Sequence, residues 1–268
     1  MTIGIFYNHS NNGPGKVINN LIQGLYNIGI EINHNSIGNV NGSLNQIRFD
    51  LPHDTFMGPN LVVLPSHNPQ LFSKYKNIIV PSEWVRNCYY SFTECKESKI
   101  IVWSVGIDTN KFEIKKDIKQ DCFVYVKNRS DQELNNVINF LKSKRLSYSI
   151  LRYGQYTESQ LIQSCIESKF CILLTYTESQ GIAYMEILST NTPCYVFNMK
   201  IWEGFCPATS TPYFDESLCG IIDNDFDFNK LENFFNNYQR YNPREYILKN
   251  HTLEISAIKY SNILTGVL

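Results

Sequence analysis

Residues 170–197 read FCILLTYTESQGIAYMEILSTNTPCYVF, and the pattern of this segment indicates the fold class. It opens on a continuous apolar run at 170–174, the pattern of a strand that is buried on both faces of a parallel sheet. A glycine-containing turn and a helical stretch at 182–190 follow, and Pro193 introduces a second short apolar run at 193–197. Strand, helix and strand in this order predict a right-handed βαβ unit.

The same alternation extends through the chain in both directions. Short apolar or aromatic runs are expected as strands, and the longer amphipathic or polar stretches between them as helices. Strands are predicted at 3–7, 29–33, 61–64, 77–80, 99–103, 122–126, 147–152, 170–174, 193–197 and 220–222, and helices at 16–28, 83–92, 131–144, 158–167, 182–190, 228–238 and 252–264. The pattern is typical of an α/β fold with mostly parallel sheets.

One boundary divides the chain into two sets of strands. A charged, glycine-poor run at 113–121 follows the strand at 99–103 and fits an interdomain linker. We expect one Rossmann-like domain at 1–114, a second at 115–251, and an amphipathic helix in the final segment, 252–268. Two open α/β domains that face each other hold their ligand in the crevice between them, at the carboxyl ends of the strands.

The amino-acid composition argues against partners that are bound through a large net charge on the protein. The 268 residues are 43% hydrophobic and carry 24 Lys and Arg against 25 Asp and Glu, a net charge of −1. This balance argues against wrapping a long nucleic acid or docking on an anionic membrane, so we expect no nucleic-acid partner. A small basic pocket for a phosphate is compatible with it.

The chain is expected to be cytoplasmic. No run approaches the roughly 18 apolar residues of a membrane span, and residues 1–7 lack the basic region and cleavage site of a signal peptide. Eight cysteines are scattered without a C-x-x-C pair. They are predicted to be buried free thiols in a reducing compartment, not disulfides or zinc ligands.

The turn before the helix at 182–190 has the features of an anion site. N–H groups in the first turn of a helix have no partner inside it, and the helix dipole favours negative charge there. Gly181 lets a ligand approach the backbone closely. Glu186, within the helix, can reach a diol beside a bound phosphate, and Glu178 stays at the mouth of the crevice. Helix capping and a solvated helix face explain the same carboxylates, so the residues alone leave both interpretations open.

The spacing Glu178-x7-Glu186, with Gly181 between the two and Pro193 after them, resembles the E-x7-E element of retaining GT-B glycosyltransferases of family four. Three other passages fall in the family's order. Residues 12–17, NGPGKV, are similar to its G-G-x-G-R-V loop, residues 79–83, IVPSE, to its V-S-E/D step, and residues 105–112, VGIDTNKF, to its G-I-D-x-x-x-F passage. The resemblance implies two Rossmann-like domains facing a cleft. It further implies a reduced acceptor-side N-terminal domain, a C-terminal nucleotide-sugar-binding domain, and a final helix that packs back on the first domain.

The resemblance also implies how the donor is held. Glu186 accepts hydrogen bonds from the ribose hydroxyls of a nucleotide sugar, and Glu178 lies near the 3-hydroxyl of the transferred sugar. The sugar hydroxyls and the distal phosphate are held by the backbone amides of Gln180, Gly181, Ile182 and Ala183.

Two cations are expected beside the leaving group. The family places an Arg and a Lys after the first strand of its second domain, where Lys127 and Arg129 are the cations of this chain. Fixed cations stabilise the negative charge that grows on a departing diphosphate. A solvated strand end is the alternative interpretation of both residues. Arg152 and Tyr153 end a strand where the family has its base-binding loop, and stacking of either on the base is expected.

The first domain offers four further candidates. Gly13 and Gly15 lie in a strand–turn–helix position where the backbone passes near the donor or acceptor, although a G-x-G without a third glycine also fits a plain turn. Lys16 can face the phosphates from the start of the helix. His67 follows the run at 61–64 and is expected at the carboxyl end of a buried strand, near the donor sugar. His9 is the second choice, and an ordinary polar loop residue explains either histidine.

The resemblance implies transfer of a sugar, with retention of anomeric configuration, from a UDP-, GDP- or ADP-linked donor to a glycan or small-molecule acceptor. Asp223, Asp225 and Asp227 superficially resemble the D-x-D metal motif of another glycosyltransferase fold, but capping of the next helix explains them, so no metal is expected. Two alternatives stay open. One is a non-catalytic nucleotide-sugar- or glycan-binding module, suggested by the small first domain. The other is a GT-B-like nucleotide-sugar epimerase.

Overall fold

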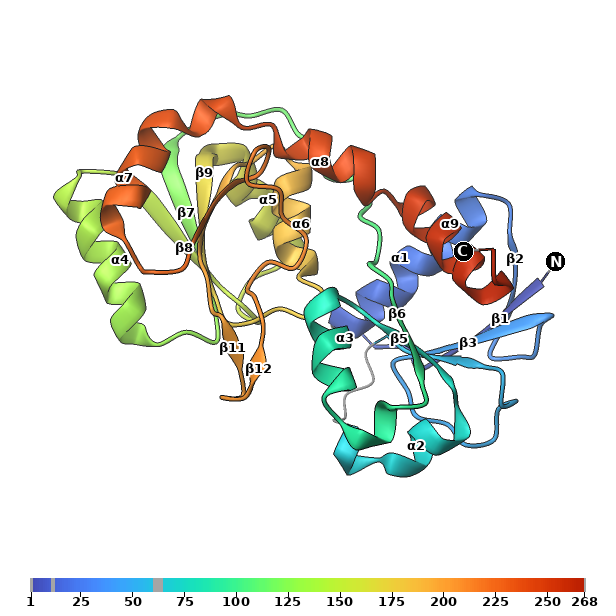
Figure 1. Ribbon diagram of the computed structural model, residues 1–268. Coiled ribbons are helices and arrows are strands. Elements are labelled where there is room, and N and C mark those ends of the chain that lie inside the picture. Colours follow the sequence, from blue (N-terminus) through green and yellow to red (C-terminus); the bar gives the residue numbers. More distant parts are fainter. Residues whose placement is uncertain (1, 11–12, 60–64, 268) are drawn as a thin grey trace. The chain divides into compact units, whose positions relative to one another are not determined.

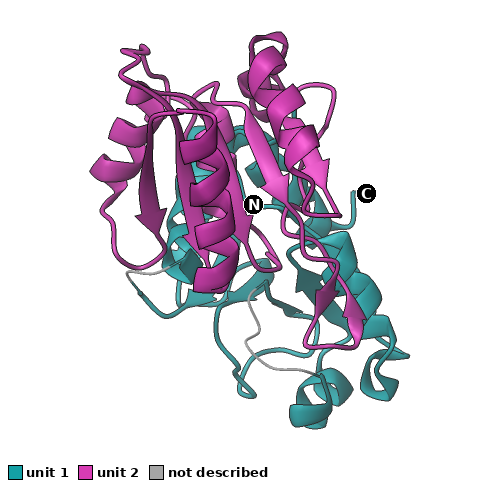
Figure 2. Cartoon of the chain, turned by 90° about the vertical axis from the view of Figure 1, so that its left-hand side faces the viewer, with its two compact units in different colours: residues 1–107, 250–268 teal, residues 108–249 magenta. Residues whose placement is uncertain are grey.

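The chain forms two compact units, as Figure 2 shows. In the computed structural model, residues 2–10, 13–59 and 65–267 are described. The first unit comprises residues 1–107 and 250–268, and the second comprises residues 108–249. Among the described residues, no helix combines the length and the apolar character needed to cross a bilayer.

The first unit is built on a six-stranded parallel sheet (Figure 1). Its strands lie in the order β2-β1-β3-β4-β5-β6. Their bounds are β1 (Thr2–Tyr7), β2 (Glu31–His34), β3 (Val40–Leu44), β4 (Phe56–Met57), β5 (Asn77–Val80) and β6 (Lys99–Val102). Strands β1 and β5 are buried on both faces, which explains their largely apolar sequences.

Helices from both ends of the chain complete this unit. They are α1 (Gly13–Asn27), α2 (Pro69–Lys74), α3 (Glu83–Tyr90) and α9 (Leu253–Thr265), with short 3₁₀ turns η1 (Pro65–His67) and η2 (Thr93–Cys95). Helix α9 lies against α1 (Figure 1). The approach is close, because a Cβ added at Gly24 would lie 2.4 Å from the Leu253 carbonyl oxygen. The buried side of α9 is tied to the chain after β6, since Trp103 Nε1 donates to the Ser256 carbonyl at 2.9 Å.

The second unit has a five-stranded parallel sheet in the order β13-β10-β9-β7-β8. Its strands are β7 (Gln120–Lys127), β8 (Tyr148–Arg152), β9 (Ser168–Thr175), β10 (Cys194–Phe197) and β13 (Gly220–Asp223). The helices are α4 (Asp131–Ser143), α5 (Glu158–Glu167), α6 (Ile182–Ser189), α7 (Phe228–Asn237) and α8 (Pro243–Asn250), with the 3₁₀ turn η3 (Tyr238–Arg240). A small antiparallel hairpin, β11 (Ile201–Trp202) with β12 (Cys206–Pro207), follows β10.

Most predicted elements are confirmed within a few residues, and the expected α/β class with parallel sheets is confirmed. Strands β3 and β4, the hairpin β11–β12 and helices α2 and α8 were not predicted. The predicted strand at 61–64 lies outside the described residues. All eight cysteines are buried and free, as expected of small apolar side chains.

The division between the units differs from the sequence-based boundary near residue 115. It falls between residues 107 and 108, and the chain crosses back between 249 and 250. The charged run belongs to the second unit because the backbone N–H groups of Asp117 and Lys119 donate to carbonyls at the end of α5, at 3.0 and 2.9 Å. The returning chain joins the first unit where Ile107 donates its N–H to the His251 carbonyl at 2.8 Å.

Candidate functional site

The strongest candidate site lies at the carboxyl edge of the sheet in the second unit. All five strands are parallel, so their last residues, Lys127, Arg152, Thr175, Phe197 and Asp223, lie along one edge. The chain runs from β7 to β8 on one side and later to β9 on the other. The strand order therefore reverses between β7 and β9, and open α/β sheets bind their ligands at such a switch point.

Helix α6 begins directly after β9 and requires glycine at its first cap. Gly181 has φ 76° and ψ 42°, the left-handed region that favours glycine. A Cβ at this position would lie 1.9 Å from Cε1 of Tyr184, so no other residue fits without moving that buried ring. Ile182 and Ala183 form the first turn, whose N–H groups have no acceptor within the helix.

Glu178 is buried beside Lys127, so a solvated helix face does not explain it. Each of its carboxylate oxygens lies 2.9 Å from the Lys127 Nζ atom, and the residue is 8% exposed. Burial raises the pKa of the Glu178 carboxyl, and the adjacent ammonium opposes this rise. The pairing explains how two charged side chains lie at a largely buried position.

Tyr153 covers the same lysine from β8. The Lys127 Nζ atom lies 4.5 Å from the centre of the Tyr153 ring, a cation–π contact. The ring is 49% exposed, so it also presents a flat apolar surface to solvent. Its neighbour Arg152 is paired with Asp131 at 3.0 Å.

Arg129 is buried, so its interpretation as a solvated strand end is wrong. Its side chain is 4% exposed and forms an ion pair with Glu133. The Nη1 atom donates to the carbonyls of Thr175 at 3.0 Å and Phe197 at 2.8 Å, which end β9 and β10. The guanidinium therefore joins the carboxyl ends of neighbouring strands.

Buried polar atoms without partners gather in the loops around the start of α6. Gln180 is 5% exposed, and neither its amide nitrogen nor its amide oxygen has a hydrogen-bond partner among the described residues. The buried hydroxyls of Thr175, Thr177 and Thr211 also have no hydrogen-bond partner among the described residues. An unsatisfied buried group costs about 1–3 kcal/mol, so these groups are candidates for binding a ligand that both donates and accepts. The three threonines were not predicted, because no sequence pattern distinguishes them from ordinary loop residues.

Hydrogen bonds connect the loops that carry these groups. Glu178 donates its backbone N–H to the Thr209 carbonyl at 2.9 Å. Ser210 Oγ donates to the Thr175 carbonyl at 3.0 Å, and Asn198 Oδ1 accepts from the Ser210 N–H at 2.8 Å. The backbone around Glu178 is therefore held in place by the loop that follows the hairpin.

Glu186 lies one turn into α6 and is 3% exposed. A solvated helix face therefore does not explain it. Burial of an acidic side chain near the start of a helix, in a loop region with unsatisfied polar groups, is a feature of a binding site more than of a surface helix.

The candidates of the first unit lie after β1, at the start of α1 and in the turn η1. Gly15 has no room for a side chain, since a Cβ would lie 1.7 Å from the Ser10 carbonyl oxygen, whereas Gly13 faces open space. Lys16 is half-buried in the first turn of α1. His67 is exposed at the end of η1, and His9 is exposed with its ring 4.9 Å from that of Tyr7.

The acidic cluster after β13 has a structural role. Asp227 caps α7 by accepting from the Asn229 N–H, as expected. Asp223 is 1% exposed and accepts from the Tyr195 hydroxyl at 2.8 Å and from the Asp227 N–H at 2.6 Å. Across residues 2–10, 13–59 and 65–267, no three His, Cys, Asp or Glu side chains are grouped as metal ligands.

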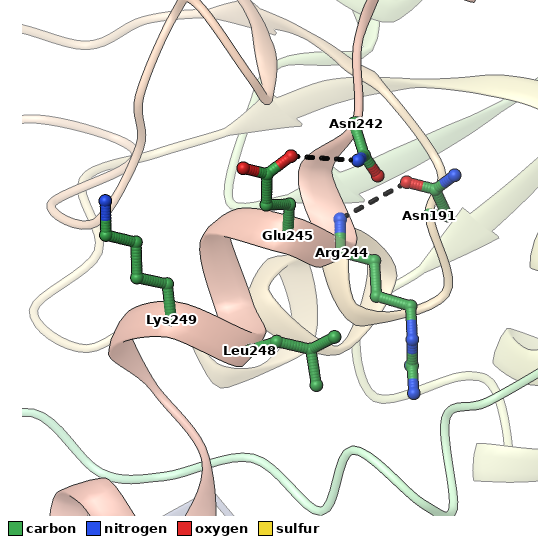
Figure 3. A pocket seen from close by; sticks show the side chains of 6 residues that line it. All are labelled: Asn191, Asn242, Arg244, Glu245, Leu248 and Lys249. Carbon is green, nitrogen blue, oxygen red and sulfur yellow. Dashed lines mark hydrogen bonds between the residues drawn. The ribbon is translucent and has the colours of Figure 1, made fainter.

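A separate hollow of about 530 Å³ lies beside α8 (Figure 3). Much of its polar lining is already used within the fold. Arg244 donates its backbone N–H to Asn191, as Figure 3 shows, and its guanidinium to the carbonyls of Ser189 at 2.7 Å and Thr109 at 3.1 Å. This hollow is therefore a weaker candidate than the switch point.

No protein-family model matches the chain, and no curated protein matches its sequence. Solved structures match its fold over the whole length. The chain is similar to the lipopolysaccharide outer core galactosyltransferase WaaB in its apo form, with TM-score 0.62 and 12% identity, covering 100% of both chains. It is similar to a sucrose-phosphate synthase from Thermosynechococcus elongatus, with TM-score 0.60 and 11% identity, covering 100% of this chain and 99% of that one.

A third similar structure is an alpha-glucosyltransferase in complex with UDP, with TM-score 0.63 and 10% identity, covering 99% of this chain and 100% of that one. These neighbours are GT-B glycosyltransferases. The chain therefore has the GT-B glycosyltransferase fold, which confirms the fold class predicted from the sequence.

Proposed function

We propose that this chain is a glycosyltransferase that moves a sugar from a nucleotide-diphosphate-sugar donor to a glycan or small-molecule acceptor. The observation that carries the proposal is the switch point of the second unit. There a lysine, the first turn of α6 and a buried glutamine lie at one edge of the sheet, and the glutamine side chain has no hydrogen-bond partner among the described residues. A cation and open N–H groups suit a diphosphate, and a buried amide that donates and accepts suits sugar hydroxyls.

The donor would lie along the loops that follow β7 and β9. The amides of Ile182 and Ala183, with those of Gln180 and Gly181, would hold the distal phosphate and the sugar. Glu186, buried within α6, would accept hydrogen bonds from the ribose hydroxyls. The half-exposed ring of Tyr153, with Arg152 beside it, would stack on the base.

The chemistry requires stabilisation of a departing diphosphate. In the proposed reaction the bond from the anomeric carbon to the diphosphate breaks, and the acceptor oxygen bonds to the same face of that carbon. The acceptor proton passes to an oxygen of the leaving phosphate, which retains configuration without a protein nucleophile. Lys127 and the N-terminus of α6 would stabilise the developing charge, and the protein supplies positioning. Arg129 would act by fixing the strand ends that carry the site.

We assign the first unit to the acceptor side. Gly15 lets α1 approach the chain after β1 closely, and we propose that Gly13, Lys16 and His67 take part in binding the donor or the acceptor. No metal cofactor is part of the proposal, because Lys127 and the α6 N-terminus supply the positive charge that the leaving group requires.

A thermal-shift panel of UDP, GDP and ADP, with their common sugars, tests the donor assignment. One nucleotide should raise the melting temperature, and Glu186→Ala should reduce that rise while Glu31→Ala, on the edge strand β2, leaves it unchanged. Normal donor binding by the Glu186 variant would overturn the assignment. Slow donor hydrolysis that is lost in Lys127→Met but kept in Lys142→Met would distinguish an enzyme from a binding module. An epimerised donor formed without acceptor would identify an epimerase.

A further inference from the structure

We propose that Glu178 competes with the donor diphosphate for the ammonium of Lys127. In this inference, which rests on the proposed function, the donor-free protein holds its phosphate-binding lysine in an internal ion pair that the donor must replace. Glu178 is thereby released to meet the transferred sugar only once the diphosphate has arrived.

The geometry of the pair is that of a full salt bridge. The Nζ atom of Lys127 lies 2.9 Å from both carboxylate oxygens of Glu178. The lysine side chain is 22% exposed and the glutamate side chain 11% exposed. Two charges that are largely buried attract each other more strongly than an exposed pair does. An incoming anion must therefore compete with the Glu178 carboxylate for the Lys127 ammonium.

The lysine is the partner that can move. The backbone of Glu178 is held by the Thr209 carbonyl at 2.9 Å, and a glutamate side chain is short. Lys127 ends β7 on a flexible four-carbon stem. The Tyr153 ring, 4.5 Å from the ammonium, offers a second attractive surface that carries no charge. The ammonium can therefore leave the carboxylate while staying over the ring.

The competition makes an unusual prediction about binding. Removing a side chain from a binding site normally weakens affinity, but neutralising Glu178 frees Lys127 for the diphosphate. Glu178→Gln should therefore bind the nucleoside diphosphate about fivefold more tightly than the natural chain, the equivalent of about 1 kcal/mol. Transfer of the sugar should fall in the same variant, since the carboxylate is then missing from the sugar side.

Isothermal titration of the full chain with UDP, GDP, ADP and inorganic pyrophosphate tests this. The matched control is Glu167→Gln, which changes the net charge equally but breaks a pair with Lys119 elsewhere in the second unit. We expect tighter binding in Glu178→Gln and in Glu178→Ala, unchanged binding in Glu167→Gln, and weaker binding when Lys127→Met is added to Glu178→Gln. Circular dichroism verifies that each variant is folded. If Glu178→Gln does not fold, Glu178→Ala provides the binding measurement instead.

The outcomes separate the two proposals. Equal or weaker binding by the folded Glu178 variants would overturn the competition while leaving a nucleotide-binding protein. Equal tightening in Glu167→Gln would also overturn it, because the gain would then come from net charge alone. No binding of any of the four probes to the natural chain would instead overturn the proposed function.

Discussion

Replacing Gly181 with alanine should destabilise the start of α6 in two ways, through backbone strain and through a steric clash with a buried ring. The residue has φ 76°, and a left-handed conformation costs a residue with a Cβ about 1–2 kcal/mol. The new Cβ would also lie 1.9 Å from the Tyr184 ring. That ring is 2% exposed, and its hydroxyl accepts from the Tyr213 N–H at 2.9 Å.

Moving the Tyr184 ring breaks this hydrogen bond and repacks a buried site, which costs about 2–3 kcal/mol beyond the backbone strain. Gly204 is the matched control, because it has the same φ of 76° with nothing within 4 Å of an added Cβ. We therefore expect Gly181→Ala to melt about 6–12 °C lower than the natural chain and Gly204→Ala only about 2–5 °C lower. Differential scanning calorimetry measures both. Equal shifts in the two variants would refute the steric argument.

Three further predictions concern stability, each read from denaturation curves. Arg129→Ala should lower the free energy of unfolding by about 2–4 kcal/mol, because two strand-end carbonyls and the Glu133 carboxylate each lose one of their partners. Arg129→Lys should recover less than half of this loss, since an ammonium lacks the guanidinium fork, and an unchanged free energy of unfolding in Arg129→Ala would contradict the argument. Gly15→Ala should lower the free energy of unfolding by about 2 kcal/mol or more, because its new Cβ would lie 1.7 Å from the Ser10 carbonyl oxygen, whereas Gly13→Ala should change it by no more than about 0.5 kcal/mol. Similar losses in the two variants would show that the close approach at Gly15 is unimportant. Burial lowers the pKa of His251 to about 4 from 6.5, so on acidification the unfolded chain binds the proton before the folded one does. Up to about 3 kcal/mol of the free energy of unfolding should therefore be lost as pH falls from 6.5 toward 4. His251→Gln should lose less over this range, and an identical pH profile in that variant would show that His251 is not the cause.

The fold was largely predictable because the strands β1, β5, β7, β9 and β10 are buried on both faces. Runs such as those at 78–80 and 170–174 are continuously apolar for this reason. Strand β3 was missed because its sequence, VNGSL, contains small and polar residues. The structure explains them in part, since a Cβ at Gly42 would lie 2.1 Å from the hydroxyl of Tyr260, which α9 brings from the other end of the chain. Such a long-range contact leaves no local pattern.

The candidate site was predictable only in its outline. The glycine turn and the two glutamates are visible in sequence, and the structure places Gly181 at the α6 cap as a left-handed residue. The pairing of Lys127 with Glu178 depends on β7 and β9 being neighbours, which brings together residues that are 51 positions apart. The burial of Arg129 depends on the ends of β9 and β10 in the same way. Register and strand order, not residue types, decide these contacts.

Amide chemical-shift mapping by NMR would locate the donor-binding site. On titration with the nucleoside diphosphate that stabilises the protein best, we predict the largest shifts at Gln180, Gly181 and Ile182, together with the side-chain amide of Gln180. Shifts confined to other parts of the chain, such as the hollow at Asn191 and Lys249, would contradict a donor site at the β7–β9 switch point.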